Sequence, residues 1–157
     1  MRWKGQRLVR DATGRVFDAG YRFAFGKAVV VREGRDVTLI GTGTQTSRVV
    51  DAAELLAARG VDAHVLHVPT VKPLDTEAIV AAAERTGRVI TVEEHTVLGG
   101  LGGAVAEVLG ELRPTQLNRI GLQDTYVQSG PNDELLDIYG LSAARVAEQV
   151  LAILGRD

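Results

Sequence analysis

Residues 37–46 read Val37-Thr38-Leu39-Ile40-Gly41-Thr42-Gly43-Thr44-Gln45-Thr46. The first four form a short aliphatic and β-branched run, which is typical of a buried strand. The glycines that follow mark a turn, and beyond them apolar residues recur at helical spacing, at Val49, Val50, Ala53, Leu56 and Ala57. The stretch therefore predicts a strand, a glycine loop and a helix, which together are the repeating unit of an α/β fold.

The same alternation continues towards the end of the chain. Further strands are predicted at 63–68, 89–92 and 117–122, with apolar helical stripes between and after them. Asp75 and Ser142 are placed to cap two of the helices, and Gly87 to end one of them. Strands that alternate with helices imply right-handed crossovers and a mainly parallel sheet covered on both faces. We therefore expect a three-layer α/β domain.

Upstream of this pattern, residues 28–31 form another β-branched run, separated from residues 37–40 by a charged turn that contains Gly34. Such a turn allows an antiparallel hairpin between the two runs. Residues 1–25 are rich in arginine, glycine and aromatic side chains and show no sustained periodicity. We interpret them as an N-terminal arm or linker; the alternative is a strand or arm packed on the domain.

Composition excludes several classes of function. A chain of 157 residues, 45% of them hydrophobic, has room for one domain with a sizeable core. A net charge of −2 leaves no positive excess for nucleic acid or an anionic membrane. The absence of cysteine excludes disulfides, thiolate metal sites and a cysteine nucleophile. Because the chain also lacks the apolar stretch of a signal peptide, we expect a cytoplasmic protein.

The loop after residue 40 has two interpretations. Its glycines lie where a dinucleotide-binding fingerprint would lie, but Thr46 replaces the third glycine, and Asp62 precedes the next strand instead of ending it. The loop remains a candidate anion site, formed by free helix N–H groups and by Thr42, Gly43, Thr44, Thr46 and Ser47. The structural alternative is a tight turn in which Thr46 or Ser47 is the N-cap.

The most distinctive stretch is Glu93-Glu94-His95-Thr96-Val97-Leu98-Gly99-Gly100-Leu101-Gly102-Gly103, which joins a strand to a helix. Ligand sites and partner contacts concentrate at the carboxyl ends of parallel strands, so the two carboxylates and the imidazole invite a catalytic interpretation. No nucleophile lies nearby in the sequence, and His64 and His67 point to opposite faces of their strand. The glycines allow close approach of the backbone to another subunit or to the sheet below.

Several of these segments, in this order, resemble the C-terminal domain of transketolases. The resemblance is carried by Phe25-Gly26-Lys27-Ala28, Arg32 to Thr38, Ala52 to Leu56, Lys72 to Asp75, Val92 to His95, Gly99 to Gly102, Gly121 to Tyr126, Ser129 to Pro131 and Asp133 to Leu141. It implies a domain over residues 26–157, built on a five-stranded, mostly parallel sheet whose first strand is antiparallel. Deoxyxylulose-phosphate synthases and the decarboxylating components of 2-oxoacid dehydrogenases share this domain, but the Glu-Glu-His and glycine segments are most similar to transketolases, particularly those divided into two chains.

The resemblance also implies what this chain lacks. Enzymes of the family hold thiamine diphosphate and magnesium between two other domains, through a Gly-Asp-Gly motif that is absent here. We therefore expect a subunit, or a fragment, that binds no cofactor or metal and is inactive alone. It would assemble with subunits that carry the thiamine site, in a hetero-oligomer built on a dimer. The candidate interface is Glu94, His95, Gly99, Gly100, Gly102 and Gly103. The alternatives are a free-standing small-molecule or anion-binding regulatory module, and the equivalent domain of a 2-oxoacid dehydrogenase component.

Overall fold

Strands and helices alternate along the chain in a computed structural model that describes residues 16–17 and 20–156. The strands are β1 (Val29–Arg32), β2 (Val37–Gly41), β3 (Ala63–His67), β4 (Arg88–Thr96) and β5 (Gln116–Leu122). The helices are α1 (Gln45–Ala58), α2 (Thr76–Thr86), α3 (Leu101–Leu112), α4 (Asn132–Ile138) and α5 (Ala143–Leu154). The predicted order of elements is therefore confirmed.

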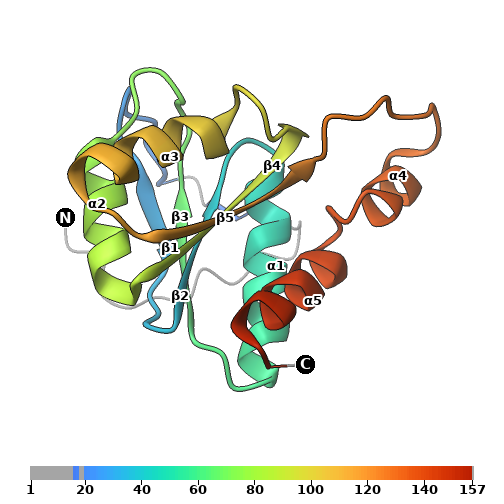
Figure 1. The fold of residues 1–157 in the computed structure, drawn as a ribbon, viewed down its shortest axis with the longest axis horizontal. Helices are drawn as coiled ribbons and strands as arrows, with labels where there is room; N and C mark the ends of the chain where they lie inside the picture. The colour runs from blue at the N-terminus through green and yellow to red at the C-terminus, as the bar shows by residue number, and fades with distance from the viewer. Residues whose placement is uncertain (1–15, 18–19, 157) are drawn as a thin grey trace.

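The five strands form one sheet in the order β1-β3-β2-β4-β5 (Figure 1). β1 is antiparallel to β3, and the other pairs are parallel, which confirms the predicted fold class. The predicted hairpin between the first two strands is wrong, because β3 lies between them. The backbone N–H groups of Arg35 and Asp36 both donate to the carbonyl of Asp62, at 3.0 and 2.9 Å, so the turn after β1 is held against the start of β3.

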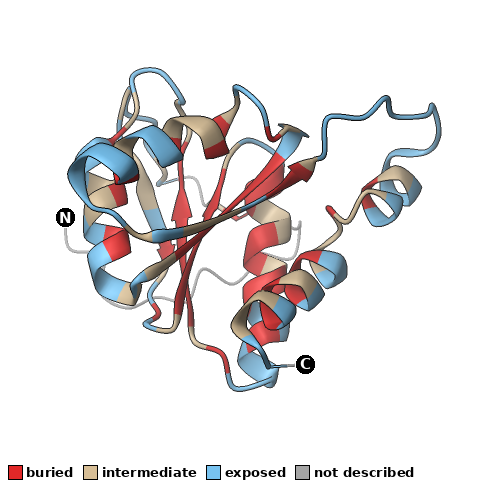
Figure 2. Ribbon diagram, viewed as in Figure 1, coloured by how far each residue is buried: buried red, intermediate tan, exposed pale blue. Residues whose placement is uncertain are grey.

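Helices cover both faces of the sheet, and each face has its own hydrophobic core. One core lies beneath α1 and α5 and includes Leu39, Val65 and Ile90. The other lies beneath α2 and α3 and includes Ile40 and Leu66. Neighbouring residues of one strand, such as Leu39 and Ile40, belong to opposite cores, as alternating side chains require. The buried strands and the exposed outer sides of the helices are visible in Figure 2.

Local signals in the sequence explain where most helices begin and end. Asp75 caps α2 by accepting a hydrogen bond from the N–H of Ala78 at 3.2 Å, and Gly87 ends it in a left-handed conformation at φ +67°. Ser142 caps α5 as predicted. The predicted cap of α1 is wrong: this helix begins at Gln45, after Thr44. The side-chain amide of Gln45 is buried and donates to the carbonyl of Leu141 at 2.7 Å. Thr46 and Ser47 therefore lie inside the helix and do not cap it.

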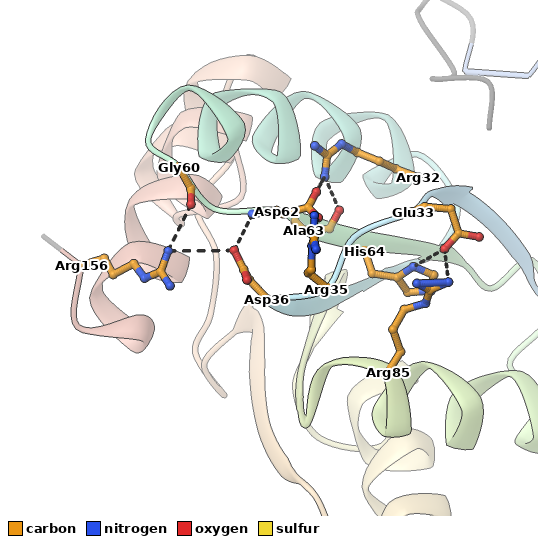
Figure 3. A network of polar contacts seen from close by, with 10 residues as sticks. All are labelled: Arg32, Glu33, Arg35, Asp36, Gly60, Asp62, Ala63, His64, Arg85 and Arg156. Atoms are coloured by element: carbon orange, nitrogen blue, oxygen red, sulfur yellow. Dashed lines mark hydrogen bonds and ion pairs between the residues drawn. The ribbon is translucent and has the colours of Figure 1, made fainter.

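The edge of the sheet at the amino ends of the parallel strands is closed by ion pairs (Figure 3). Arg32 and Arg35 both contact the carboxylate of Asp62, at 3.5 and 3.4 Å. Arg156, after α5, donates to the carbonyl of Gly60 at 3.2 Å and approaches Asp36. This edge is therefore occupied by contacts within the chain, which leaves the opposite, carboxyl edge as the place to look for a site.

Part of the segment predicted to be an arm lies against the domain. Val16 is buried in the core beneath α1 and α5, and the ring of Phe17 lies 5.0 Å from the ring of His67 and 4.4 Å from that of Tyr21. Trp3 lies outside the described residues. In the described part of the chain, none of the helices has the length and apolar character needed to cross a membrane.

Candidate functional site

The two candidate sites predicted from the sequence meet at the carboxyl edge of the sheet. The carboxylate of Glu94, at the end of β4, accepts hydrogen bonds from the hydroxyl of Thr44 at 3.1 Å and from the guanidinium of Arg48 at 2.9 Å. Arg48, on α1, also donates to the side-chain oxygen of Gln45. The loop before α1 and the end of β4 therefore form one surface. Sequence reasoning did not single out Arg48, which is a polar position in a helical pattern and is half-buried in the structure.

The hydroxyl groups of the predicted anion site are hydrogen-bonded within the chain. Thr42 donates to Val68 O at 2.7 Å, Thr44 to Glu94, Ser47 to Thr44 O at 3.0 Å, and Thr46 shares a 2.7 Å bond with His67 Nδ1. Gly43 is turned into the left-handed region at φ +53°. An anion at this loop would have to displace Glu94 from Thr44 and Arg48, so anion binding here stays a prediction that the geometry does not favour.

Glu93 has a structural position that the sequence pattern did not distinguish from its neighbour. Its side chain is 2% exposed and points beneath the start of α3. There the two carboxylate oxygens accept hydrogen bonds from the backbone N–H groups of Leu101, at 2.7 Å, and Gly102, at 2.9 Å. A buried negative charge at a helix N-terminus is stabilised by these donors and by the helix dipole. Glu93 is therefore the cap of α3.

The glycines of the candidate interface fall into two groups. A Cβ atom on Gly100 would collide with the carboxylate of Glu93, and one on Gly102 would lie 2.8 Å from Thr91 Oγ1 and from Arg119 Cδ. These two glycines allow close packing inside the chain, against the sheet below. Gly99 has φ +72°, and at Gly99 and Gly103 a Cβ would meet nothing within 4 Å. Gly103 is therefore the position where a side chain can be added without disturbing the domain.

The three histidines do not come together. His95 is exposed, and its Nδ1 donates to the carbonyl of Thr96 at 2.8 Å, so the second ring nitrogen, Nε2, is left to the surface. His67 contacts α1 through Thr46, while His64 lies 3.7 Å from Glu33, beside Arg85 of α2. The predicted opposite orientation is confirmed. Burial lowers the pKa of His67, and it lowers the pKa of His64 despite the opposing pull of Glu33.

A small apolar pocket adjoins this surface, and sequence reasoning missed it. The pocket has a volume of about 130 Å³ and is lined by Glu94, Leu122, Val127, Asn132, Leu135, Leu136, Tyr139 and Leu141. Its walls are the end of β5, the following loop and α4, which extend beyond the rest of the domain in Figure 1.

The donor groups at this edge do not fit thiamine diphosphate and magnesium. Among the residues that the structure describes, no three His, Asp or Glu side chains are grouped so that they could hold a metal ion. The start of α3, where a pyrophosphate would find free N–H donors, is occupied by the carboxylate of Glu93. The remaining pocket is apolar and small. No chemical step of a cofactor can be assigned to these residues.

Together, these features define a three-layer α/β domain with one edge closed internally and a polar and apolar surface at the other. Residues 26–146 match the transketolase C-terminal domain family. The chain therefore belongs to the transketolase C-terminal domain family.

Relatives and a solved structure agree with this assignment. The chain is 45% identical over 148 residues to a transketolase family protein of Sinorhizobium fredii, covering 92% of this chain and 43% of that one. It is 44% identical to the 6-deoxy-6-sulfo-D-fructose transketolase subunit SqwH of a Clostridium species, covering 89% and 44%. A structure described as a split gene transketolase, inactive beta4 tetramer, superposes with a TM-score of 0.83 at 42% identity, covering 88% and 45%. The chain thus spans less than half the length of these relatives.

Proposed function

We propose that this chain is the C-terminal assembly subunit of a split, thiamine-diphosphate-dependent enzyme that transfers a ketol or acyl group. The family match supports this most directly, together with a carboxyl edge whose charged groups are engaged in holding loops in place. In this proposal, partner subunits hold the thiamine diphosphate and magnesium, and the complex is a hetero-oligomer built on a dimer. The description of a relative as a beta4 tetramer supports the self-association.

The partner subunit contacts the surface formed by Glu94, His95 and the glycine loop. His95 presents its Nε2 to solvent, and a buried interface has to pair this polar atom. Gly103 lies at the start of α3 with open space where a Cβ would stand. A second chain can approach the helix there as closely as its backbone allows.

Calorimetry tests whether the cofactor site lies elsewhere. We expect no heat of binding when thiamine diphosphate and magnesium chloride are titrated together into the purified chain at about 100 μM. Micromolar affinity for the cofactor would contradict the proposal, because it would require a site within this chain.

Variants of the surface separate assembly from catalysis when they are mixed with the subunit of the same genome that carries the thiamine-binding domains. Gly103→Gln should weaken complex formation without destabilising the free chain, since a Cβ at this position meets nothing within 4 Å. His95→Ala should weaken the complex by about 1–3 kcal/mol if the imidazole is hydrogen-bonded at the interface. The matched control is Gly110→Gln, also on α3 with open space at its Cβ and away from the carboxyl edge. If these variants assemble normally but lose turnover, the surface has a catalytic role and is not the subunit interface.

A further inference from the structure

Tyr126 is the most exposed large hydrophobic side chain of the described residues. It lies in the loop between β5 and α4, with 102% of its reference area accessible, and its neighbour Val127 is 49% exposed. Figure 2 shows this loop exposed along its length, at the far side of the domain from α2. An aromatic side chain held entirely in water retains the full hydrophobic free energy of burial for a contact with something else.

The apolar pocket beside this loop has the properties of a receptor for such a ring. Its volume of about 130 Å³ compares with engineered cavities of about 150 Å³ that bind benzene. Leu122, Leu135 and Leu141 supply apolar walls, and Glu94 is a polar group among them. Tyrosine combines an apolar ring with a hydroxyl that needs a partner when it is buried. A tyrosine whose ring packs on these leucines and whose hydroxyl lies near Glu94 would have both its apolar ring buried and its hydroxyl paired.

We propose that Tyr126 of one copy of this chain inserts into the pocket of a second copy, and that the second copy reciprocates. Val127 lines the pocket, whereas Tyr126, the next residue, is fully exposed and does not line it, so ring and receptor are neighbours on one surface. A two-fold axis beside the loop brings each ring to the other copy's pocket, which is the arrangement of an isologous dimer. This inference rests on the self-association proposed above and gives it a location.

The buried area and the charges of the patch limit the strength of this contact. Two tyrosines contribute about 300–500 Å², while a stable specific interface buries about 1,200 Å² or more. The loop and the exposed Ile138 of α4 add to the area, so we expect a dissociation constant in the micromolar range. Asp133 and Glu134, in the first turn of α4, bring like charges together across the axis. Dimerisation should therefore strengthen when salt screens them.

Sedimentation velocity of the full chain from about 1 to 200 μM tests the inference. Tyr126→Ala should weaken the dimer at least about 100-fold, because each dimer loses two buried rings. Leu135→Arg, which puts a charge in the pocket, should have the same effect with Tyr126 intact. Phe25→Ala is the matched control: Phe25 is an exposed aromatic residue at 70%, on a different loop, and its removal should leave the dimer unchanged.

Mixing the two disabling variants gives the sharpest result. Tyr126→Ala retains an intact pocket and Leu135→Arg retains an intact ring, so an equimolar mixture should form heterodimers through one insertion, although neither variant dimerises alone. Circular dichroism checks that both are folded. A dimer that Tyr126→Ala leaves unchanged overturns the inference but keeps the self-association. A chain that stays monomeric at 200 μM overturns both, and a mixture without heterodimers overturns the reciprocal insertion.

Discussion

Replacing Glu93 tests whether this residue of the Glu-Glu-His segment caps α3. Its carboxylate is buried and accepts the N–H groups of Leu101 and Gly102, the first two residues of α3. In Glu93→Ala both N–H groups lose their acceptor in a place that water reaches poorly. The variant therefore removes a helix cap and leaves two buried donors unsatisfied.

The expected magnitude follows from these two bonds. A hydrogen bond to a charged group contributes about 1.5–3 kcal/mol, and the loss of a helix cap by itself costs about 1 kcal/mol. Because the two bonds end on one carboxylate, their losses are not fully additive, and we expect about 3 kcal/mol for Glu93→Ala. For a chain of this size that lowers the melting temperature by about 6–12 °C. Glu93→Gln keeps one accepting oxygen and should lose about 2 kcal/mol.

Urea denaturation followed by circular dichroism measures these changes. Glu94→Gln is the control, because Glu94 is partly exposed and its ion pair with Arg48 should contribute about 1 kcal/mol or less. Gly100→Ala, whose Cβ would displace the Glu93 carboxylate, should be destabilising in the wild-type background and nearly neutral in Glu93→Ala. If Glu93→Ala unfolds within about 1 kcal/mol of wild type, or if the two substitutions are additive, Glu93 is not the cap described above.

Two further outcomes are expected from stability measurements. Gly103→Ala should stabilise the free chain by about 0.5–1 kcal/mol, because its Cβ stands in open space on a helix. Gly102→Ala should destabilise it by about 1–3 kcal/mol, because its Cβ crowds the sheet below. Urea midpoints in the opposite order would refute this assignment. Burial lowers the pKa of His64 and His67 from the ordinary value of 6.5, so below that pH the unfolded chain binds more protons than the folded one. The free energy of unfolding should be fully retained above about pH 6.5 and decrease as the pH falls below it. His64→Leu should reduce this decrease, and an unchanged profile between pH 7.5 and 5.5 would contradict the explanation.

The sequence predicts the fold well because its main signals are local. β-branched runs, glycine turns and capping residues such as Asp75 and Ser142 act within a few residues, and the structure has them where they were expected. The pairing of β1 was not accessible in the same way. A five-residue turn permits a hairpin, and only the placement of β3 between β1 and β2, which depends on the crossover through α1, excludes it.

The site was less predictable, because the direction of a side chain at the end of a strand depends on tertiary packing. Glu93 and Glu94 are adjacent and chemically identical, but one is buried beneath α3 and the other reaches across to α1. The signal that would have separated them is Gly100 at the helix start, which makes room for a carboxylate beneath it. The pocket depends on α4 lying against the end of β5, which no local pattern indicates.

The Glu-Glu-His segment therefore connects three parts of the chain. Glu93 fixes the start of α3, Glu94 fixes the loop before α1 through Thr44 and Arg48, and His95 faces solvent between them. A substitution at either glutamate displaces a neighbouring segment before it affects a partner, so loss of assembly in such a variant is ambiguous. His95 and Gly103 do not carry this ambiguity, because neither side-chain position supports another segment of the domain. Substitutions at His95 and Gly103 therefore test whether this edge is an interface, provided that stability and assembly are measured on the same protein.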